Sequence, residues 1–178
     1  NAISVLTEPY FFKGEDKFLK EIASEVKIPL LRKDFVIDEY MIYEAKILGA
    51  SAVLLICSIL NEDTLKKYIK IADSLGLSAL VEAHDEDEIK MALRARARII
   101  GVNNRNLKDF TVNINNSINL RKLVPEDIIF IAESGIKTSE DIEKLRKANV
   151  NAVLIGETLM RSKDKKKALE YLRGYKYE

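Results

Sequence analysis

The chain has 178 residues, 47% of them hydrophobic and 32% charged, which is enough for one domain with a packed core. A net charge of +1, from 29 basic and 28 acidic residues, gives no support to nucleic-acid or acidic-membrane binding. The single cysteine, Cys57, excludes an intrachain disulfide and fits a reducing compartment such as the cytoplasm, and no apolar run approaches the roughly 20 residues that a transmembrane helix needs.

Seven short apolar runs recur along the chain, and each has the nearly continuous apolar character of a strand buried in a parallel sheet. They are AISVL (2–6), IPLLR (28–32), SAVLLI (51–56), SALV (78–81), RIIGV (98–102), DIIFIA (127–132) and NAVLI (151–155). Segments of helical period follow them at residues 15–25, 38–48, 62–75, 86–96, 115–123, from Thr138 onward, and at about 163–172. Thr138 and Asp141 have the spacing of a capping box, with Asp in place of the preferred Glu.

This alternation of strand and helix is typical of βα units, so we expect one α/β domain over residues 1–178. Seven units fit either an open doubly wound sheet or most of a (β/α)8 barrel, which has eight strands and about 250 residues. The first residue, Asn1, leads directly into a strand. We therefore expect the chain to be a piece of a longer protein or a truncation.

Polar residues follow four of the runs, where the carboxyl ends of parallel strands gather function. They are Lys33, Glu82, Asn103 and Glu133. Lys33 could be an ordinary solvated lysine, or it could project into a barrel mouth where burial and a second cation lower its pKa for acid–base work. Glu82 would be costly to bury unpaired, and beside a lysine in a pocket it becomes a candidate general base.

His84 is the only histidine and lies two residues after Glu82. That position invites a catalytic role. The acidic run 85–88 begins a helix, however, and the favoured interpretation is that His84 simply leads into it.

The remaining candidates lie in loops after the later strands and after the first. Arg105 offers a planar fork for a carboxylate or phosphate, although Asn-rich segments such as GVNNRNL (101–107) are more often plain turns. Gly135 and Gly156 each lie just past a strand and before a short helical segment, an arrangement whose backbone N–H groups bind phosphate. Phe11 and Phe12 could form a wall for an aromatic substrate, and ordinary packing explains them equally well.

Seven stretches together resemble the indole-3-glycerol phosphate synthase family, in the family's order and spacing and over essentially the whole chain. They are SVLTEPYFFKG (4–14), LLRKDF (30–35), AVLLI (52–56), LVEAHDE (80–86), GVNNRNL (101–107), AESGI (132–136) and NAVLIGETLMR (151–161). The resemblance implies a (β/α)8 barrel that acts on 1-(2-carboxyphenylamino)-1-deoxyribulose 5-phosphate. It implies closure of the indole ring with loss of CO2 and water, without a metal or organic cofactor.

The resemblance also implies roles for individual residues. Lys33 would be the general acid, Glu82 the general base, and Asn103 and Glu133 would orient substrate hydroxyls. Arg105 and Ser134 would be further site residues. Gly135, Gly156 and the N–H of Glu157 would form part of the phosphate cradle, and Phe12, Phe35 and Leu54 would be walls for the anthranilate ring.

The chain departs from the family at its start, because its first run matches the family's second strand. The helical extension and the first strand, with its glutamate, second lysine and phosphate-binding serine, are absent. We therefore expect a barrel that lacks its first strand, little synthase activity in this chain alone, and self-association through two open sheet edges. The alternatives are a non-catalytic phosphate-binding barrel fragment and an enzyme similar to phosphoribosylanthranilate isomerase, against which LLRKDF and Glu82 speak.

Overall fold

Seven parallel strands form one sheet in the computed structural model, which describes residues 1–106 and 109–174. The strands are β1 (Ile3–Leu6), β2 (Leu30–Lys33), β3 (Ala52–Ile56), β4 (Ser78–Ala83), β5 (Ile99–Asn103), β6 (Ile129–Glu133) and β7 (Ala152–Leu154). Their order in the sheet is their order in the chain, so each strand pairs with the next one. This is the topology of a barrel and not of a doubly wound sheet, in which the strand order reverses.

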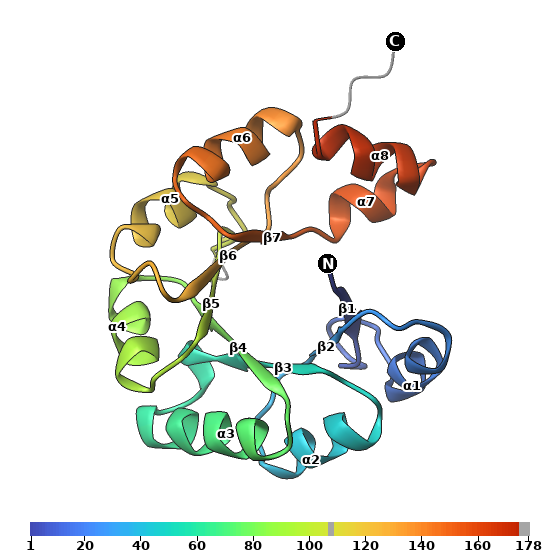
Figure 1. The fold of residues 1–178 in the computed structure, drawn as a ribbon, viewed down its shortest axis with the longest axis vertical. Helices are drawn as coiled ribbons and strands as arrows, with labels where there is room; N and C mark the ends of the chain where they lie inside the picture. Colours follow the sequence, from blue (N-terminus) through green and yellow to red (C-terminus); the bar gives the residue numbers. More distant parts are fainter. Residues whose placement is uncertain (107–108, 175–178) are drawn as a thin grey trace.

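Helices lie between successive strands, where they cover the convex face of the sheet, and helices also follow the last described strand. They are α1 (Asp16–Glu25), α2 (Tyr40–Ile47), η1 (Cys57–Ile59), α3 (Glu62–Ser74), α4 (Glu86–Arg94), α5 (Asn115–Arg121), α6 (Ser139–Lys147), α7 (Glu157–Arg161) and α8 (Lys165–Leu172). Figure 1 shows the sheet curled into an arc, with α2 to α6 on its outside and β1 and β7 on either side of its opening. The expected alternation of strand and helix is confirmed, and so is the capping box of Thr138 and Asp141 at the start of α6.

The strands are apolar on both faces because each face packs against its own cluster. One alternate set of side chains, such as Val53, Leu55 and Val81, packs outward against the helices. The other set points into the concave side of the arc, where Leu31, Leu54, Ile56 and Leu80 form a second cluster. A strand residue therefore lies in the concave space or under the helices according to its position in this alternation.

Within the described ranges, each helix is too short or too polar to cross a lipid bilayer.

Candidate active site

The four polar residues at the strand ends share the concave side of the sheet. Lys33 follows Leu31 by two residues and Glu82 follows Leu80 by two, and both leucines belong to the concave cluster. Glu133 bears the same relation to Ile131, which packs against that cluster, and Asn103 is paired directly with Glu133. The alternation of strand side chains thus brings residues from β2, β4, β5 and β6 to one place.

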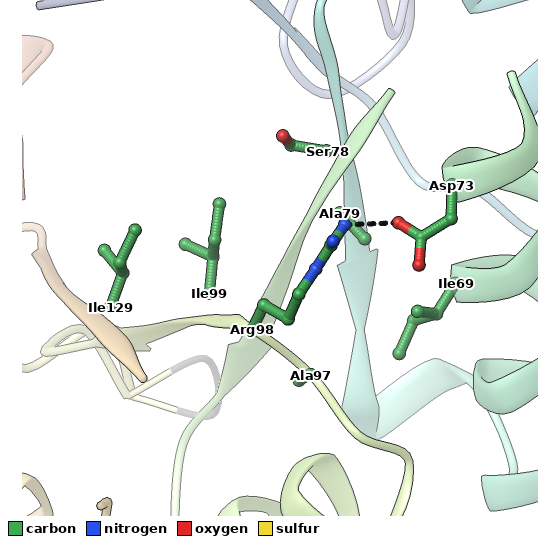
Figure 2. A pocket seen from close by; sticks show the side chains of 8 residues that line it. All are labelled: Ile69, Asp73, Ser78, Ala79, Ala97, Arg98, Ile99 and Ile129. Atoms are coloured by element: carbon green, nitrogen blue, oxygen red, sulfur yellow. Dashed lines mark hydrogen bonds and ion pairs between the residues drawn. The ribbon is translucent and has the colours of Figure 1, made fainter. Parts of the chain in front are cut away.

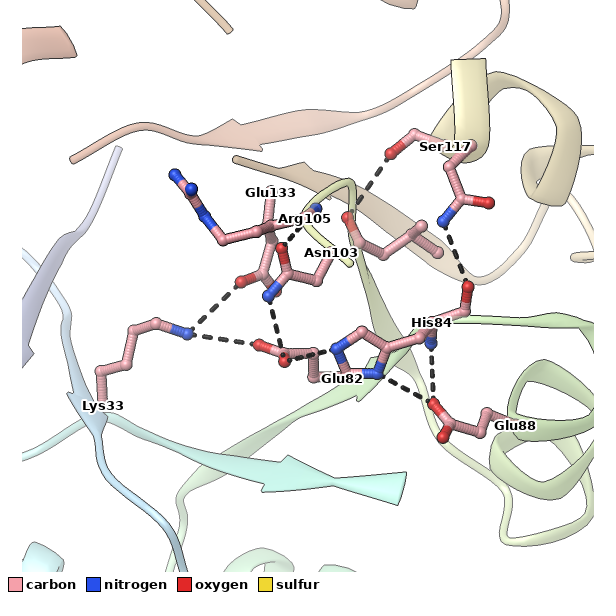
Figure 3. A network of polar contacts seen from close by, with 10 residues as sticks. Lys33, Glu82, His84, Glu88, Asn103, Arg105, Ser117 and Glu133 are labelled. Carbon is pink, nitrogen blue, oxygen red and sulfur yellow. Dashed lines mark hydrogen bonds and ion pairs between the residues drawn. The ribbon is translucent and has the colours of Figure 1, made fainter. Parts of the chain in front are cut away.

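Lys33 lies between two carboxylates. Its Nζ atom is 3.3 Å from Oε2 of Glu82 and 3.4 Å from Oε2 of Glu133, as Figure 3 shows. The Glu82 and Glu133 side chains are only 4% and 2% exposed, whereas Lys33 is 16% exposed. Asn103 donates from Nδ2 to Oε1 of Glu82 over 3.4 Å. We call Lys33, Glu82, Asn103 and Glu133 the lysine cluster.

Gly101 makes room for this arrangement. It lies in β5 beside Glu82 on one side and Ile131 on the other. A methyl group at Gly101 would collide with Oε1 of Glu133. The missing side chain therefore lets the Glu133 carboxylate reach down from its own strand end to the level of Glu82, where both can contact Lys33.

The ionisation of the lysine cluster is set by burial and by its opposite charges. Burial is the main cause that raises the pKa of Glu133 to about 7, and the nearby Glu82 raises it further, while Lys33 acts in the opposite direction. Burial also opposes the charged form of Lys33, but Glu133 and Glu82 outweigh it and hold the pKa of Lys33 above its ordinary value. The expectation that a second cation lowers the pKa of Lys33 is therefore wrong, because its neighbours are carboxylates.

His84 belongs to the same network, contrary to the interpretation that it only leads into a helix. It follows directly after β4, with Nε2 3.4 Å from Oε1 of Glu82 and Nδ1 3.1 Å from Oε2 of Glu88. Its spacing of two residues from Glu82 was the signal that could have identified it. A side chain two positions along an extended strand returns to the same face.

Aromatic side chains from two loops meet beside the lysine cluster. Phe12 and Phe35 stack with ring centroids 5.0 Å apart, and Phe11 meets the edge of Phe35 at 6.1 Å. Phe35 also packs against the concave cluster that contains Leu54, which is fully buried. Phe12 and Phe35 are thus partly exposed at the surface, and Leu54 lies in the layer below them.

Glu8, which the sequence did not single out, shapes the aromatic loop. Its carboxylate accepts hydrogen bonds from the backbone N–H groups of Tyr10, Phe11 and Phe12, at 2.8, 2.6 and 2.9 Å. Burial raises the pKa of Glu8, but these donors outweigh it and the pKa lies below its ordinary value. Glu8 lies in the TEPYFF segment of the first stretch that resembles the family. Its position in a loop is the one feature of the sequence that could have indicated a structural role.

The two glycine turns lie next to each other. The hydroxyl of Thr158, in α7, donates to the carbonyl of Ile136 over 2.7 Å and so joins the turn at Gly156 to the turn at Gly135. Ser134 and Gly135 both have positive φ, at 65° and 77°, and a Cβ at Gly135 would collide with Val112. The chain therefore needs glycine at position 135.

The two turns lead into their helices differently. Gly156 is the N-cap of α7, as expected. After Gly135 the helix follows only after a short gap, because α6 begins at Ser139, where the expected cap Thr138 closes its first turn. In the loop GVNNRNL, Arg105 is 32% exposed and reaches across to Glu157 of α7, with its Nη2 atom 3.2 Å from Oε2. Leu107, the last residue of that loop, lies outside the described residues.

A cavity of about 260 Å³ lies at the opposite ends of the strands. Figure 2 shows that it is lined by Ser78, Ile99 and Ile129, the first residues of β4, β5 and β6, and that Arg98 forms an ion pair with Asp73 across it. This is the amino-terminal end of the sheet, where barrels gain stability rather than catalysis. The candidate site is therefore the group of residues at the carboxyl ends, around the lysine cluster.

The geometry there suits proton transfer to and from a small polar molecule. One ammonium group lies between two buried carboxylates, and one of those has a pKa close to neutral pH. An acid and a base within reach of one substrate are the requirement for general acid–base chemistry. The aromatic pair and the two glycine turns flank the cluster with an apolar surface and backbone N–H groups.

Comparisons with solved structures support the fold. The chain superimposes on 3-hexulose-6-phosphate synthase from Salmonella typhimurium with a TM-score of 0.83 at 15% identity, covering 98% of this chain and 85% of that one. It matches a KGPDC structure from Streptococcus mutans with a TM-score of 0.74 at 14% identity, covering 96% and 83% of the two chains. At such low identity these likenesses concern the fold alone.

Sequence comparisons show the family. An indole-3-glycerol phosphate synthase from Ruminiclostridium cellulolyticum is 64% identical over 97% of this chain and 66% of its own length. One from Lachnoclostridium phytofermentans is 59% identical over 97% of this chain and 64% of its own length. The chain thus spans just under two thirds of the length of these curated relatives. The family model described as indole-3-glycerol phosphate synthase matches residues 1–172, and the chain belongs to that family.

Proposed function

We propose that this chain carries most of the active site of an indole-3-glycerol phosphate synthase. The substrate would be 1-(2-carboxyphenylamino)-1-deoxyribulose 5-phosphate, and the products indole-3-glycerol phosphate, CO2 and water. One observation carries the proposal: Lys33 is held between Glu82 and Glu133 at the carboxyl ends of the strands. The family match favours this reaction over that of an isomerase similar to phosphoribosylanthranilate isomerase.

The lysine cluster would divide the proton transfers of the reaction. Lys33, kept protonated by its two carboxylates, gives a proton to the ribulose carbonyl oxygen while the aromatic carbon that bears the carboxylate attacks the carbonyl carbon. Loss of CO2 then restores the aromatic ring. In the dehydration, Glu82 takes a proton from the substrate, while Lys33, reprotonated from water, gives a proton to the hydroxyl group, which leaves as water. Asn103 and Glu133 orient the substrate hydroxyl groups through these steps.

Groups on either side of the cluster would bind the two ends of the substrate. Gly135, Gly156 and the N–H of Glu157 receive the phosphate, for which two adjacent turns with backbone N–H groups are suited. Ser134 is a further site residue next to Gly135. Arg105 lies beside that cradle through its contact with Glu157. Phe12 and Phe35 cover the anthranilate ring, above Leu54. Binding at both ends would hold the aromatic carbon close to the carbonyl carbon.

The seven strands would correspond to strands two to eight of an eight-stranded barrel, in one domain formed by residues 1–178. Support comes from the greater length of the relatives and from the open arc between β1 and β7. The missing unit would close the barrel and supply further site residues. The single cysteine and a biosynthetic reaction on a phosphorylated substrate fit an enzyme of the cytoplasm.

The test is a fluorescence assay for the indole product with two proteins. One is the 178-residue chain, and the other is a chimera that adds the part of the Ruminiclostridium cellulolyticum relative outside the match. We expect the chimera to turn over at least about 100-fold faster than the chain, and Lys33→Ala to abolish its activity. A chimera that folds without turning over would contradict the proposed reaction. Equal turnover in both proteins would contradict the inference that a missing unit contributes to the active site.

A phosphate-binding fragment without catalysis is the remaining alternative. It would bind inorganic phosphate in calorimetry but show no turnover in the chimera. Phosphate binding that survives Lys33→Ala is expected in both cases, because Lys33 lies in the lysine cluster and not in the glycine turns.

A further inference from the structure

His84 lies between two carboxylates that belong to different parts of the fold. Nδ1 is hydrogen-bonded to Oε2 of Glu88 on α4, whereas Nε2 faces Oε1 of Glu82 on β4 at 3.4 Å (Figure 3). The second contact is not aligned as a hydrogen bond, so Nε2 is buried without a hydrogen-bond partner among the residues that the structure describes. A buried, unpaired ring nitrogen beside a candidate general base requires an explanation.

The position of the ring is fixed from several sides. The backbone N–H of His84 donates to Oε2 of Glu88 over 2.7 Å, and Asn116 of α5 donates to the His84 carbonyl over 3.1 Å. Glu88 is itself held, because its N–H donates to the N-cap side chain of Asp85. On the far side, Cys57 of η1 contacts the Glu88 carbonyl. The imidazole therefore keeps its place between Glu82 and Glu88.

Acidic groups surround the ring in the described part of the chain. Glu88 on α4 and Glu82 on β4 contact the ring, Glu133 on β6 acts from farther away, and Asp85 is its chain neighbour. The hydrogen bond to Glu88 is the largest cause that raises the pKa of His84, burial opposes it, and Glu82 and Glu133 raise it further. These acidic neighbours therefore favour a proton on the imidazole ring.

We propose that His84 is a positioning residue that acts through Glu82 by passing protons between Glu82 and Glu88. This inference rests on the proposed function, in which Glu82 takes a proton from the substrate. In the neutral tautomer with its proton on Nδ1, Nε2 accepts the proton from Oε1 of Glu82 as Nδ1 gives its own proton to Oε2 of Glu88. Glu82 returns to the carboxylate form, the ring stays neutral, and Glu88, whose side chain is 19% exposed, releases the proton to water. The reverse transfer carries a proton from water by way of Glu88 back to Glu82 and restores the first tautomer.

The first experiment measures the coupling in the 178-residue chain and needs no activity. Because the chain contains one histidine, its ¹⁵N imidazole resonances are unambiguous. We expect Glu82→Gln and Glu88→Gln each to lower the titration midpoint of His84 by about 0.5 pH unit or more. Asp87→Asn, on the same helix but 97% exposed, is the matched control and should leave the midpoint in place. An unchanged midpoint in Glu82→Gln would overturn the proposal.

The second experiment measures turnover in the chimera. We expect His84→Ala to lower kcat about tenfold or more and to leave KM nearly unchanged. Added imidazole should restore turnover as its concentration rises. Pyrazole has the same shape but is far too weak a base to carry a proton at neutral pH, so it should restore nothing. Asp87→Asn again serves as the control.

The outcomes separate this inference from the proposed function. Rescue by imidazole alone, together with the coupled titration, would support the relay. Equal rescue by pyrazole, or a kcat in His84→Ala equal to that of the parent chimera, would show a structural role and overturn it. A parent chimera without turnover would contradict the proposed function itself and with it the relay. The titration would then still report whether His84 and Glu82 are coupled.

Discussion

Glu133 shows how the site reduces the stability of the fold. Its pKa of about 7 in the folded chain lies above the ordinary carboxyl value of 4.5, so the folded chain binds this proton more tightly than the unfolded chain does. The resulting stability is fully present below about pH 4.5 and is lost as the pH rises through about 7. A buried carboxylate that is costly at neutral pH is typical of a residue retained for function.

Glu133→Gln should therefore stabilise the chain at pH 8 more than at pH 5. The glutamine cannot ionise, and the ammonium of Lys33 keeps Glu82 as its partner. We expect the gain in the free energy of unfolding to be larger at pH 8 by about 1–3 kcal/mol. Urea denaturation at the two pH values measures this, with the exposed Glu25→Gln as the control. If both variants showed the same pH dependence, the assignment of a raised pKa to Glu133 would be wrong.

Gly101 and Glu133 should be energetically coupled, because a methyl group at position 101 meets the Glu133 carboxylate. We expect Gly101→Ala to cost about 2 kcal/mol of unfolding free energy, the usual scale for overpacking a core. In a Glu133→Ala background the same substitution should cost less than half as much, because the collision is gone. A double-mutant cycle by urea denaturation gives both numbers. Equal costs in the two backgrounds would show that the carboxylate does not occupy the space beside Gly101.

The sequence predicts which residues form the lysine cluster, but it does not predict how they shift one another's pKa values. Lys33, Glu82, Asn103 and Glu133 could be grouped because each ends an apolar run and strand ends gather at one face. The sign of the pKa shift of Lys33 depends on which charges come within a few ångströms of it. The spacing of residues along the chain does not reveal the distances between these charges. The position of His84 was visible, but a helix start was the favoured explanation for it.

At the scale of elements, the loop between β1 and α1 depends on Glu8. Three consecutive backbone N–H groups, from Tyr10 to Phe12, point at its carboxylate, and the N–H of Gly14 donates to its carbonyl over 2.8 Å. An amide has one acceptor oxygen in place of two, and its NH₂ group would face other donors. The loop that presents Phe12 to Phe35 should therefore loosen when this carboxylate is lost.

We expect Glu8→Gln to lower the hydrogen-exchange protection of the Phe11 and Phe12 amides by about tenfold or more. Glu15→Gln, an exposed glutamate at the end of the same loop, should leave both amides as they are. The exchange rates come from amide resonances or mass spectrometry at one pH. If the two variants behaved alike, a general change of loop charge would be responsible and the Glu8 carboxylate would not be.

The predicted elements agree with the structure to within about two residues where the signal is long. The run SALV, for example, extends to Ala83 in β4. Short features such as η1 escaped prediction, because its three residues are too few to show any periodicity. Parallel order and the outer position of the helices follow from apolar continuity, because a strand covered on both faces leaves no polar side.

At the scale of the whole molecule, the arc ends in two strands that each have one unpaired edge in the described part of the chain. In β1 the N–H of Ile3 donates to Pro29, and the N–H of Thr7 just beyond the strand donates to Lys33. The ladder alternates, so the N–H groups of Ser4 and Leu6 face the open edge. Leu6 is also 41% exposed. Unpaired strand edges with apolar side chains favour pairing with another chain.

We therefore expect the 178-residue chain to self-associate, with a weight-average mass that rises with concentration in analytical ultracentrifugation. Ser4→Pro removes an N–H from the open edge and leaves the donors to β2 in place, so it should weaken association about tenfold or more. Lys122→Ala, exposed after α5 and away from both edges, is the matched control. The chimera, in which a further strand unit would cover β1 and β7, should be monomeric under the same conditions. A chain that stayed monomeric at all concentrations, or a Ser4→Pro variant that associated as strongly as the parent, would show that the edges are protected in some other way.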